Sequence, residues 1–201
     1  MARPKSTPQQ RAEIRNRIQK AASDLYNSEG ISAISARAVA QNAGVSVGTI
    51  YAHFGDLTGL MRSLWIPTVE RQGQALRALA AKFDAPLPRL KALLLDYVRF
   101  GVENAELYKG VLMFVRPEKL PLPDTDPLTT IDFADLLIET IKDGQKRGEI
   151  SQGDPEIIAQ MVWSGVHGCL ALPVNLERLS LKPAETIADP LIDGLIKAIS
   201  T

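Results

Sequence analysis

Residues 44–54 constrain this chain more than any other stretch, because they specify a tight corner between two short helices. Gly44 is the residue type that commonly ends a helix in left-handed backbone. Ser46 can cap a following helix by accepting hydrogen bonds from its first free amides. Only Val45 stands between the two, so the sequence predicts a helix-turn-helix corner.

The second helix of this corner presents small, hydroxyl and aromatic side chains, namely Val47, Gly48, Thr49, Tyr51 and His53. Ile50 and Phe54 lie four residues apart and can anchor its other side in a core. A short helix with that outer face suits the major groove of DNA, where base edges offer donors, acceptors and thymine methyl groups. An ordinary surface helical hairpin is the alternative interpretation.

The residues before the corner predict two further helices. Thr7, Pro8 and Gln10 form a helix start with a cap, a proline at the first position and a capping box. An apolar stripe then runs to a stop at Gly30, through Ile14, Ile18, Ala21, Ala22, Leu25 and Tyr26. Ser35 can cap a short helix over 35–43, and the third helix covers 47–53. We therefore predict a three-helix DNA-binding domain over residues 1–56.

The remaining residues, 57–201, predict a second, larger helical domain. A fourth helix capped by Asp56 should run towards Phe83, with a kink or break near 65–68 because Pro67 lacks an amide donor. The prolines at 117, 121, 123 and 127 predict a long loop. The other expected helices cover 86–102, 104–115, 128–147, 155–172 and a final stretch after Pro190. The fold class predicted is all-α, a helix-turn-helix head joined by a long fourth helix to a helical bundle.

Composition and charge fit an intracellular DNA-binding protein. Seven basic residues stand against three acidic ones through Gly55, a net of +4, and the neutral total leaves −4 for the rest. A basic head on an acidic body favours a partner such as DNA at one end only. One cysteine, Cys169, excludes an internal disulfide framework and is expected to be an inert filler. Because no signal peptide is recognisable and the apolar stretch 157–172 is short for a bilayer, we expect a cytoplasmic location.

Three function classes remain to be compared. An enzyme is not expected, because the two histidines lack the Glu-x-x-His spacing of di-iron bundles. The sequence also shows no glycine-rich phosphate loop, metal-spaced cysteine cluster or nucleophile elbow, so no cofactor or metal is predicted. A ligand-responsive transcriptional repressor and a DNA-binding regulator without a small effector both remain open. A sizeable enclosed cavity in the C-terminal bundle favours the first.

From about Gln9 to Leu60 the chain resembles the tetracycline-repressor (TetR) family of transcriptional regulators. The resemblance rests on Gly30, Ser35, Arg37, Val39-Ala40, Ala43-Gly44-Val45-Ser46, Gly48-Thr49-Ile50-Tyr51 and His53-Phe54. In the second half, Trp163, His167 and Gly168 resemble the Trp-His-Gly signature of one C-terminal subclass, and residues 97–114 look similar to the same subclass. The resemblance implies a homodimer on an inverted-repeat operator, released by a small apolar or aromatic effector.

The resemblance also implies roles for seven residues of the head. Bases would be approached by Arg37, Val47, Gly48 and Tyr51, and phosphates by Ser35, Thr49, Tyr51 and His53. Arginine can fork onto a guanine edge, and a hydroxyl can reach a phosphate oxygen. The alternatives are a solvated surface charge for Arg37, local packing for His53 and a pure helix cap for Ser35. One departure is Leu57, which stands where the family usually has lysine, so backbone affinity should depend more on Arg3 and Lys5.

In the second domain, aromatic and sulfur-bearing side chains are the candidates for an effector pocket. They are Trp65, Tyr97, Phe100, Tyr108, Met113, Phe114, Met161, Trp163 and His167. At helical spacing such residues also build ordinary cores, and His167 can be a core histidine bonded to a carbonyl. The resemblance implies that the helices over 128–147 and 155–172 pair with a second subunit in a four-helix bundle. Small residues at Ala159, Ser164, Gly165 and Gly168 would allow close approach, while completion of the monomer's own core is the alternative.

Overall fold

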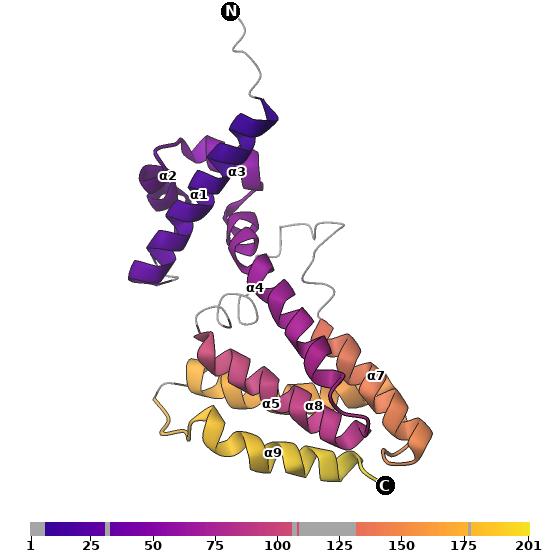
Figure 1. Cartoon of the computed structure of the whole chain (residues 1–201). Coiled ribbons are helices and arrows are strands. Elements are labelled where there is room, and N and C mark those ends of the chain that lie inside the picture. The colour runs from indigo at the N-terminus through magenta and orange to yellow at the C-terminus, as the bar shows by residue number, and fades with distance from the viewer. Residues whose placement is uncertain (1–6, 31–32, 106–107, 109–131, 177) are drawn as a thin grey trace, which may run out of the picture. The chain divides into compact units, whose positions relative to one another are not determined.

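The computed structural model describes residues 7–30, 33–105, 108, 132–176 and 178–201 (Figure 1). These residues form helices and no strand beyond a single bridge between Ile150 and Ser200. The helices are α1 (Pro8–Glu29), α2 (Ala36–Ala43), α3 (Val47–Phe54), α4 (Leu57–Ala80), α5 (Pro86–Glu103), α7 (Asp132–Arg147), α8 (Pro155–Asn175) and α9 (Ala184–Ile199). The all-α fold class predicted from the sequence is therefore confirmed in the described residues.

The chain divides into two compact units, Met1–Thr68 and Val69–Thr201, each with its own apolar core. Sequence analysis divides the domains at residue 56, whereas the compact units divide inside α4. The reason is local packing. Leu60 is fully buried in the N-terminal core, and Leu57 and Leu64 pack against it. The first turns of α4 thus belong to the N-terminal unit.

Side-chain caps begin the helices of the N-terminal unit. The capping box between Thr7 and Gln10 is present at the start of α1. Ser35 and Ser46 cap α2 and α3 as predicted, each accepting a backbone N–H at 3.1 Å. Gly44 ends α2 in left-handed backbone with φ 61°, a conformation that favours glycine. The helix-turn-helix corner is therefore built from local signals.

The junction between α3 and α4 depends on a second glycine. Asp56 Oδ1 accepts the Gly59 N–H at 2.6 Å, which caps α4. A Cβ added at Gly59 would collide with the carbonyl oxygen of Phe54, so only glycine allows this close approach. Leu57, where sequence analysis notes the missing lysine, is half-buried against the N-terminal core. Its apolar side chain contributes packing at this position.

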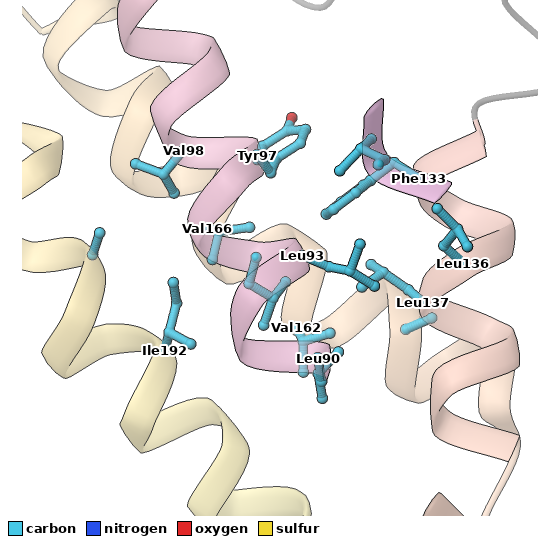
Figure 2. Packing of buried hydrophobic residues seen from close by; sticks show 14 of the residues in the cluster. Leu90, Leu93, Tyr97, Val98, Phe133, Leu136, Leu137, Val162, Val166 and Ile192 are labelled. Atoms are coloured by element: carbon cyan, nitrogen blue, oxygen red, sulfur yellow. The ribbon is translucent and has the colours of Figure 1, made fainter. Parts of the chain in front are cut away.

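The second unit is a bundle in which α5 lies against α7, α8 and α9. Figure 2 shows its core, with Leu90, Leu93, Tyr97 and Val98 of α5 among side chains from the three other helices. Leu90 and Leu93 are fully buried. This single apolar stripe on α5 organises the bundle.

Three predicted helix boundaries are wrong, and each involves a proline. Helix α4 continues through Pro67 without the expected break. Proline leaves the carbonyl four residues earlier without its helical donor, and here Gln19 Nε2 of α1 donates to that carbonyl of Ser63 at 3.2 Å. The freed carbonyl is satisfied by tertiary contact, so the helix continues.

The other two prolines lie in the second unit. Helix α8 passes Pro173 and ends at Asn175, and α9 begins at Ala184, with Pro190 inside it. Thr186, whose carbonyl Pro190 leaves unpaired, is exposed, so water can satisfy it. The predicted helix over 104–115 and the loop over 116–127 lie mostly or wholly outside the described residues.

Helix α8 is long and apolar enough, by length and composition alone, to cross a membrane. The sequence-based expectation took this stretch to be shorter, because it ended the helix at residue 172. Core helices meet the same two criteria, and Val162 and Val166 of α8 are fully buried against other helices of the bundle. Its composition is accounted for by this packing.

Candidate functional site

In the N-terminal unit, the corner places its predicted contact residues at or near the surface. Arg37, in the first turn of α2, is exposed, and none of the described residues forms an ion pair or hydrogen bond with it. Ser35 is exposed and its hydroxyl oxygen is already used by the Ala38 N–H. A guanidinium beside a helix N-terminus forms a local positive site, which favours phosphate or guanine contacts.

Helix α3 separates an outer face from an inner one. Ile50 is fully buried, whereas Tyr51 is 47% exposed and Gly48 is exposed. Val47 lies four residues before Tyr51, so the two share a face. The Thr49 hydroxyl lies 2.8 Å from the Ser46 hydroxyl, a contact that holds it at the start of the helix. The outer face of α3 is thus small and apolar at its beginning and aromatic at its end.

Arg15 is a residue that sequence reasoning missed. Its Nη1 donates to the His53 carbonyl at 2.7 Å, and its guanidinium lies 4.2 Å from the centroid of the Phe54 ring. These contacts fasten the end of α3 to α1. The signal for this role is position, because Arg15 lies at the edge of the stripe formed by Ile14 and Ile18. His53 itself is half-buried with its ring beside Phe54.

In the C-terminal unit, three of the predicted pocket residues form one polar cluster. The hydroxyl oxygens of Tyr97 and Tyr108 lie 2.8 and 2.9 Å from His167 Nδ1. Burial raises the pKa of Tyr97 to about 12 and also raises the pKa of Tyr108. Burial lowers the pKa of His167. At neutral pH the cluster therefore consists of two phenols and a neutral imidazole.

Aromatic rings pack around this cluster. Tyr97 stacks on Phe133 with centroids 4.6 Å apart, and Trp163 meets both rings edge-on. The Trp163 Nε1 atom is buried and forms no hydrogen bond with good geometry. The sequence suggests each aromatic residue as a candidate separately. Their convergence from α5, α7 and α8 becomes visible only in the fold.

A hollow of about 460 Å³ lies between α7 and α8. Its lining is Ala134, Leu137, Ile138, Glu156, Ala159, Gln160, Trp163, Ser164 and His167. The exposed side chains of Glu156, Gln160 and Ser164 give it a polar, solvent-accessible rim. The remaining lining is mostly apolar or aromatic. Within the described residues, no three His, Cys, Asp or Glu side chains are grouped so that they could hold a metal ion.

The nine pocket candidates are distributed unevenly. Trp163 and His167 line the hollow, and Tyr97 and Tyr108 bond to His167. Phe100 is half-buried and is not part of that lining, and Met161 is 57% exposed. Trp65 is buried and belongs to the N-terminal unit. Met113 and Phe114 lie outside the described residues.

The small residues of α8 lie on different faces of the helix. Ala159 is buried, and a Cβ at Gly165 would come within 2.7 Å of the Leu195 side chain on α9. Gly168 has no atom within 4 Å of its would-be Cβ. Beside Gly168, an exposed apolar face of α8 is formed by Ile157, Met161 and Leu172, which are 58%, 57% and 51% exposed. The apolar stripe of α7, by contrast, is buried in its own chain at Phe133, Leu137 and Ile141.

Comparison with known proteins identifies the N-terminal unit. Residues 18–64 match the family described as bacterial regulatory proteins, tetR family. These residues form a TetR-family domain. The HTH-type transcriptional regulator AcrR of Shigella flexneri is 33% identical over 99 residues, covering 49% of this chain and 46% of AcrR. The chain thus spans about half the length of the curated relatives that it matches.

Solved structures extend the likeness to the whole fold. A Rhodococcus sp. RHA1 protein of unknown function matches with a TM-score of 0.71 and 22% identity, covering 94% of this chain and 95% of that one. The regulator FadR of Bacillus subtilis, solved with stearoyl-CoA, matches with a TM-score of 0.69 and 17% identity, covering 92% and 98%. The fold following the TetR-family domain is therefore also TetR-like.

Proposed function

We propose that this chain is a ligand-responsive transcriptional repressor. In this proposal it binds an inverted-repeat operator as a homodimer in the cytoplasm, and a small apolar or aromatic effector releases it. The observation that carries the proposal is the capped helix α3, which turns Tyr51 and Gly48 outward beside the exposed Arg37, within a TetR-family domain.

Arg37 and Tyr51 are proposed to read bases. An exposed guanidinium without a described partner is available for a bidentate contact with guanine. Tyr51 offers a ring to thymine and a hydroxyl to the backbone. Val47 and Gly48 would approach bases closely, and Ser35, Thr49 and His53 would approach phosphates. The positive balance of the N-terminal residues adds sequence-independent attraction.

The effector is proposed to bind in the C-terminal unit. The hollow between α7 and α8 has the size of many small-molecule sites and a mostly apolar lining. FadR shares the fold and was solved with an acyl-CoA, which supports a ligand-binding role for the corresponding unit. Helix α4 contributes residues to both compact units, so it is the proposed path by which ligand binding reaches the head. The effector must bind the two states of the protein with different affinities.

A homodimer is proposed through the exposed apolar face of α8. One head covers too few bases for useful specificity, and a two-fold dimer meets a two-fold operator. Three large apolar side chains more than half exposed on one helix face are what a second copy would cover. The role proposed for α7 in the interface has less support, because its apolar stripe is buried in its own chain.

A regulator without a small-molecule effector is the second candidate. The rim of the hollow is exposed, so the hollow is more open than the enclosed cavity that a ligand-responsive protein would favour. In that case a protein partner or the abundance of the regulator would control DNA binding.

The proposed function is tested by fluorescence anisotropy with DNA duplexes at fixed salt. Arg37→Ala should weaken binding to the preferred duplex by about 1–3 kcal/mol and relax base preference at one position of each half-site. Lys82→Ala is the matched control, because it removes an equally exposed positive charge in the other unit. Equal effects of the two substitutions, or unchanged binding when Arg37 and Tyr51 are both altered, would refute the assignment.

A further inference from the structure

The polar cluster behind the hollow fixes the hydrogen-bonding state of one wall residue. Tyr97 forms its hydrogen bond with His167 Nδ1, at 2.8 Å, and with no other described acceptor. Tyr108 has two partners, His167 Nδ1 at 2.9 Å and the His167 carbonyl oxygen at 3.3 Å. Tyr108 can therefore donate to the carbonyl, whereas Tyr97 needs Nδ1 as its acceptor. An imidazole accepts at Nδ1 only when that nitrogen carries no hydrogen.

His167 is consequently held as the tautomer that carries its hydrogen on Nε2. The raised pKa of Tyr97 and Tyr108 keeps both hydroxyls protonated, and the lowered pKa of His167 keeps its ring neutral. The opposite tautomer would leave the buried Tyr97 hydroxyl without an acceptor, which is costly. Because the Nδ1 edge of the ring faces the tyrosines, the Nε2 edge is the one left for the hollow that His167 lines.

The surroundings of this donor restrict what it can bind. Trp163 lies one turn before His167 on α8 and contributes an indole surface to the same wall. Ala134, Leu137, Ile138 and Ala159 complete an apolar lining. No lysine or arginine is among the described lining residues, and Glu156 at the rim disfavours an anion. A cation would have to leave water for an apolar lining, and the ring edge there would offer it a donor.

We propose that the hollow takes an uncharged ring compound with one hydrogen-bond acceptor, and that the Nε2–H of His167 donates to that acceptor. Tyr97 and Tyr108 are positioning residues, which act by fixing the tautomer and orientation of the imidazole. The proposal rests on the proposed function, in that it names the chemical class of the effector. It makes FadR's ligand class a poor model for this chain, since an acyl-CoA carries several phosphate charges.

The tautomer is tested directly by long-range proton–nitrogen NMR spectra of the full-length protein labelled in histidine. The chain has two histidines, so the spectrum of a His167→Gln variant assigns both. At pH 7 we expect an unprotonated Nδ1 and a protonated Nε2 for His167. In the Tyr97→Phe variant a mixture of tautomers should appear. A protonated Nδ1 in the wild-type protein would overturn the proposal.

The ligand class is tested with three matched probes that differ in one substituent, measured by calorimetry without DNA. They are 2-acetylnaphthalene, with a neutral acceptor, 2-ethylnaphthalene, without one, and 2-naphthoate, with a charge. The acetyl compound should bind about tenfold more tightly than the ethyl compound, the value of one hydrogen bond. Naphthoate should bind most weakly.

Variants connect this preference to the proposed residues. His167→Phe keeps a ring of similar size and should abolish the preference for acetyl over ethyl, while Tyr97→Phe should reduce it. Circular dichroism and thermal melting verify that each variant is folded. Equal binding of the acetyl and ethyl compounds to the wild type, or no binding of any probe, would overturn this inference. DNA binding is measured separately, so its loss or retention judges the proposed function alone.

Discussion

The two units of this chain stabilise their helices by different means. In the N-terminal unit, Thr7, Ser35, Ser46 and Asp56 each accept a backbone N–H at a helix start. In the C-terminal unit, α5 and α9 begin at Ala85 and Pro183 without any side-chain cap. The bundle relies instead on long stripes of fully buried apolar residues, such as Leu90 and Leu93. Short helices need local signals, whereas long helices with a large buried face can do without them.

The largest expected effect tests whether the two cores are energetically separate. Ile50 and Leu93 are both fully buried, one in each unit. Ile50→Ala and Leu93→Ala should each cost about 2–5 kcal/mol, through lost burial and a residual cavity. Amide hydrogen exchange should accelerate mainly in the unit that carries the substitution. Ile50→Val, at about 0.5–1.5 kcal/mol, is the graded control. Equal loss of protection in both units would contradict the comparison.

The next effect concerns the face by which the second unit is proposed to associate. Gly168→Glu places a charge on the exposed apolar face of α8, where its Cβ meets no atom of the same chain. In a two-fold dimer both copies bring this charge, so the dissociation constant should rise about a thousandfold. Gly165→Ala is the control, because its Cβ meets the flexible Leu195 side chain of α9 within one chain.

Sedimentation velocity across micromolar concentrations measures the outcome. We expect a wild-type dimer, a monomeric Gly168→Glu variant with unchanged helical content, and a Gly165→Ala variant that still dimerises. A wild-type monomer, or a dimer unaffected by the Gly168 substitution, would refute the interface. Gly165→Glu would not separate the possibilities, because it strains the packing between α8 and α9.

The smallest predicted effect concerns the contact by which α1 supports α4 at Pro67. Gln19→Ala removes the donor to the Ser63 carbonyl and should cost about 1 kcal/mol, the value of one hydrogen bond. With Pro67→Ala in the background, a helical N–H replaces that donor, so the same Gln19 substitution should cost less. Urea unfolding of the four proteins closes this double-mutant cycle. A coupling energy of zero would show that Gln19 does not compensate for the proline.

The same contrast explains how far the sequence predicts the structure. In the N-terminal unit the caps and the glycine stops place α1, α2 and α3 to within a residue of their observed bounds. In the C-terminal unit Pro173 and Pro190 suggest boundaries that do not occur, because tertiary packing outweighs one missing hydrogen bond. Local signals are readable in sequence, whereas compensation by residues far along the chain, such as Gln19, is not.

The candidate sites differ in the same way. Exposed residues on one short helix, such as Tyr51 and Gly48, follow from its period and its buried partner Ile50. Their contact with DNA stays a prediction. The bonding of Tyr97 and Tyr108 to one nitrogen of His167 joins residues 59 and 70 positions apart, and no spacing rule foresees it. Sequence analysis names those three residues but not their arrangement.

The central claim is that two copies of this chain read a two-fold DNA site through α2 and α3. The most direct measurement is selection of duplexes from a random pool by the full-length protein, followed by sequencing and by determination of the stoichiometry on the enriched site. The account predicts an inverted repeat with half-sites about one helical turn apart, or a multiple of it, bound by two protomers. It also predicts that the Arg37→Ala protein loses preference at one symmetric pair of positions. Enrichment of no sequence, or of a single half-site bound by one protomer, would contradict the claim.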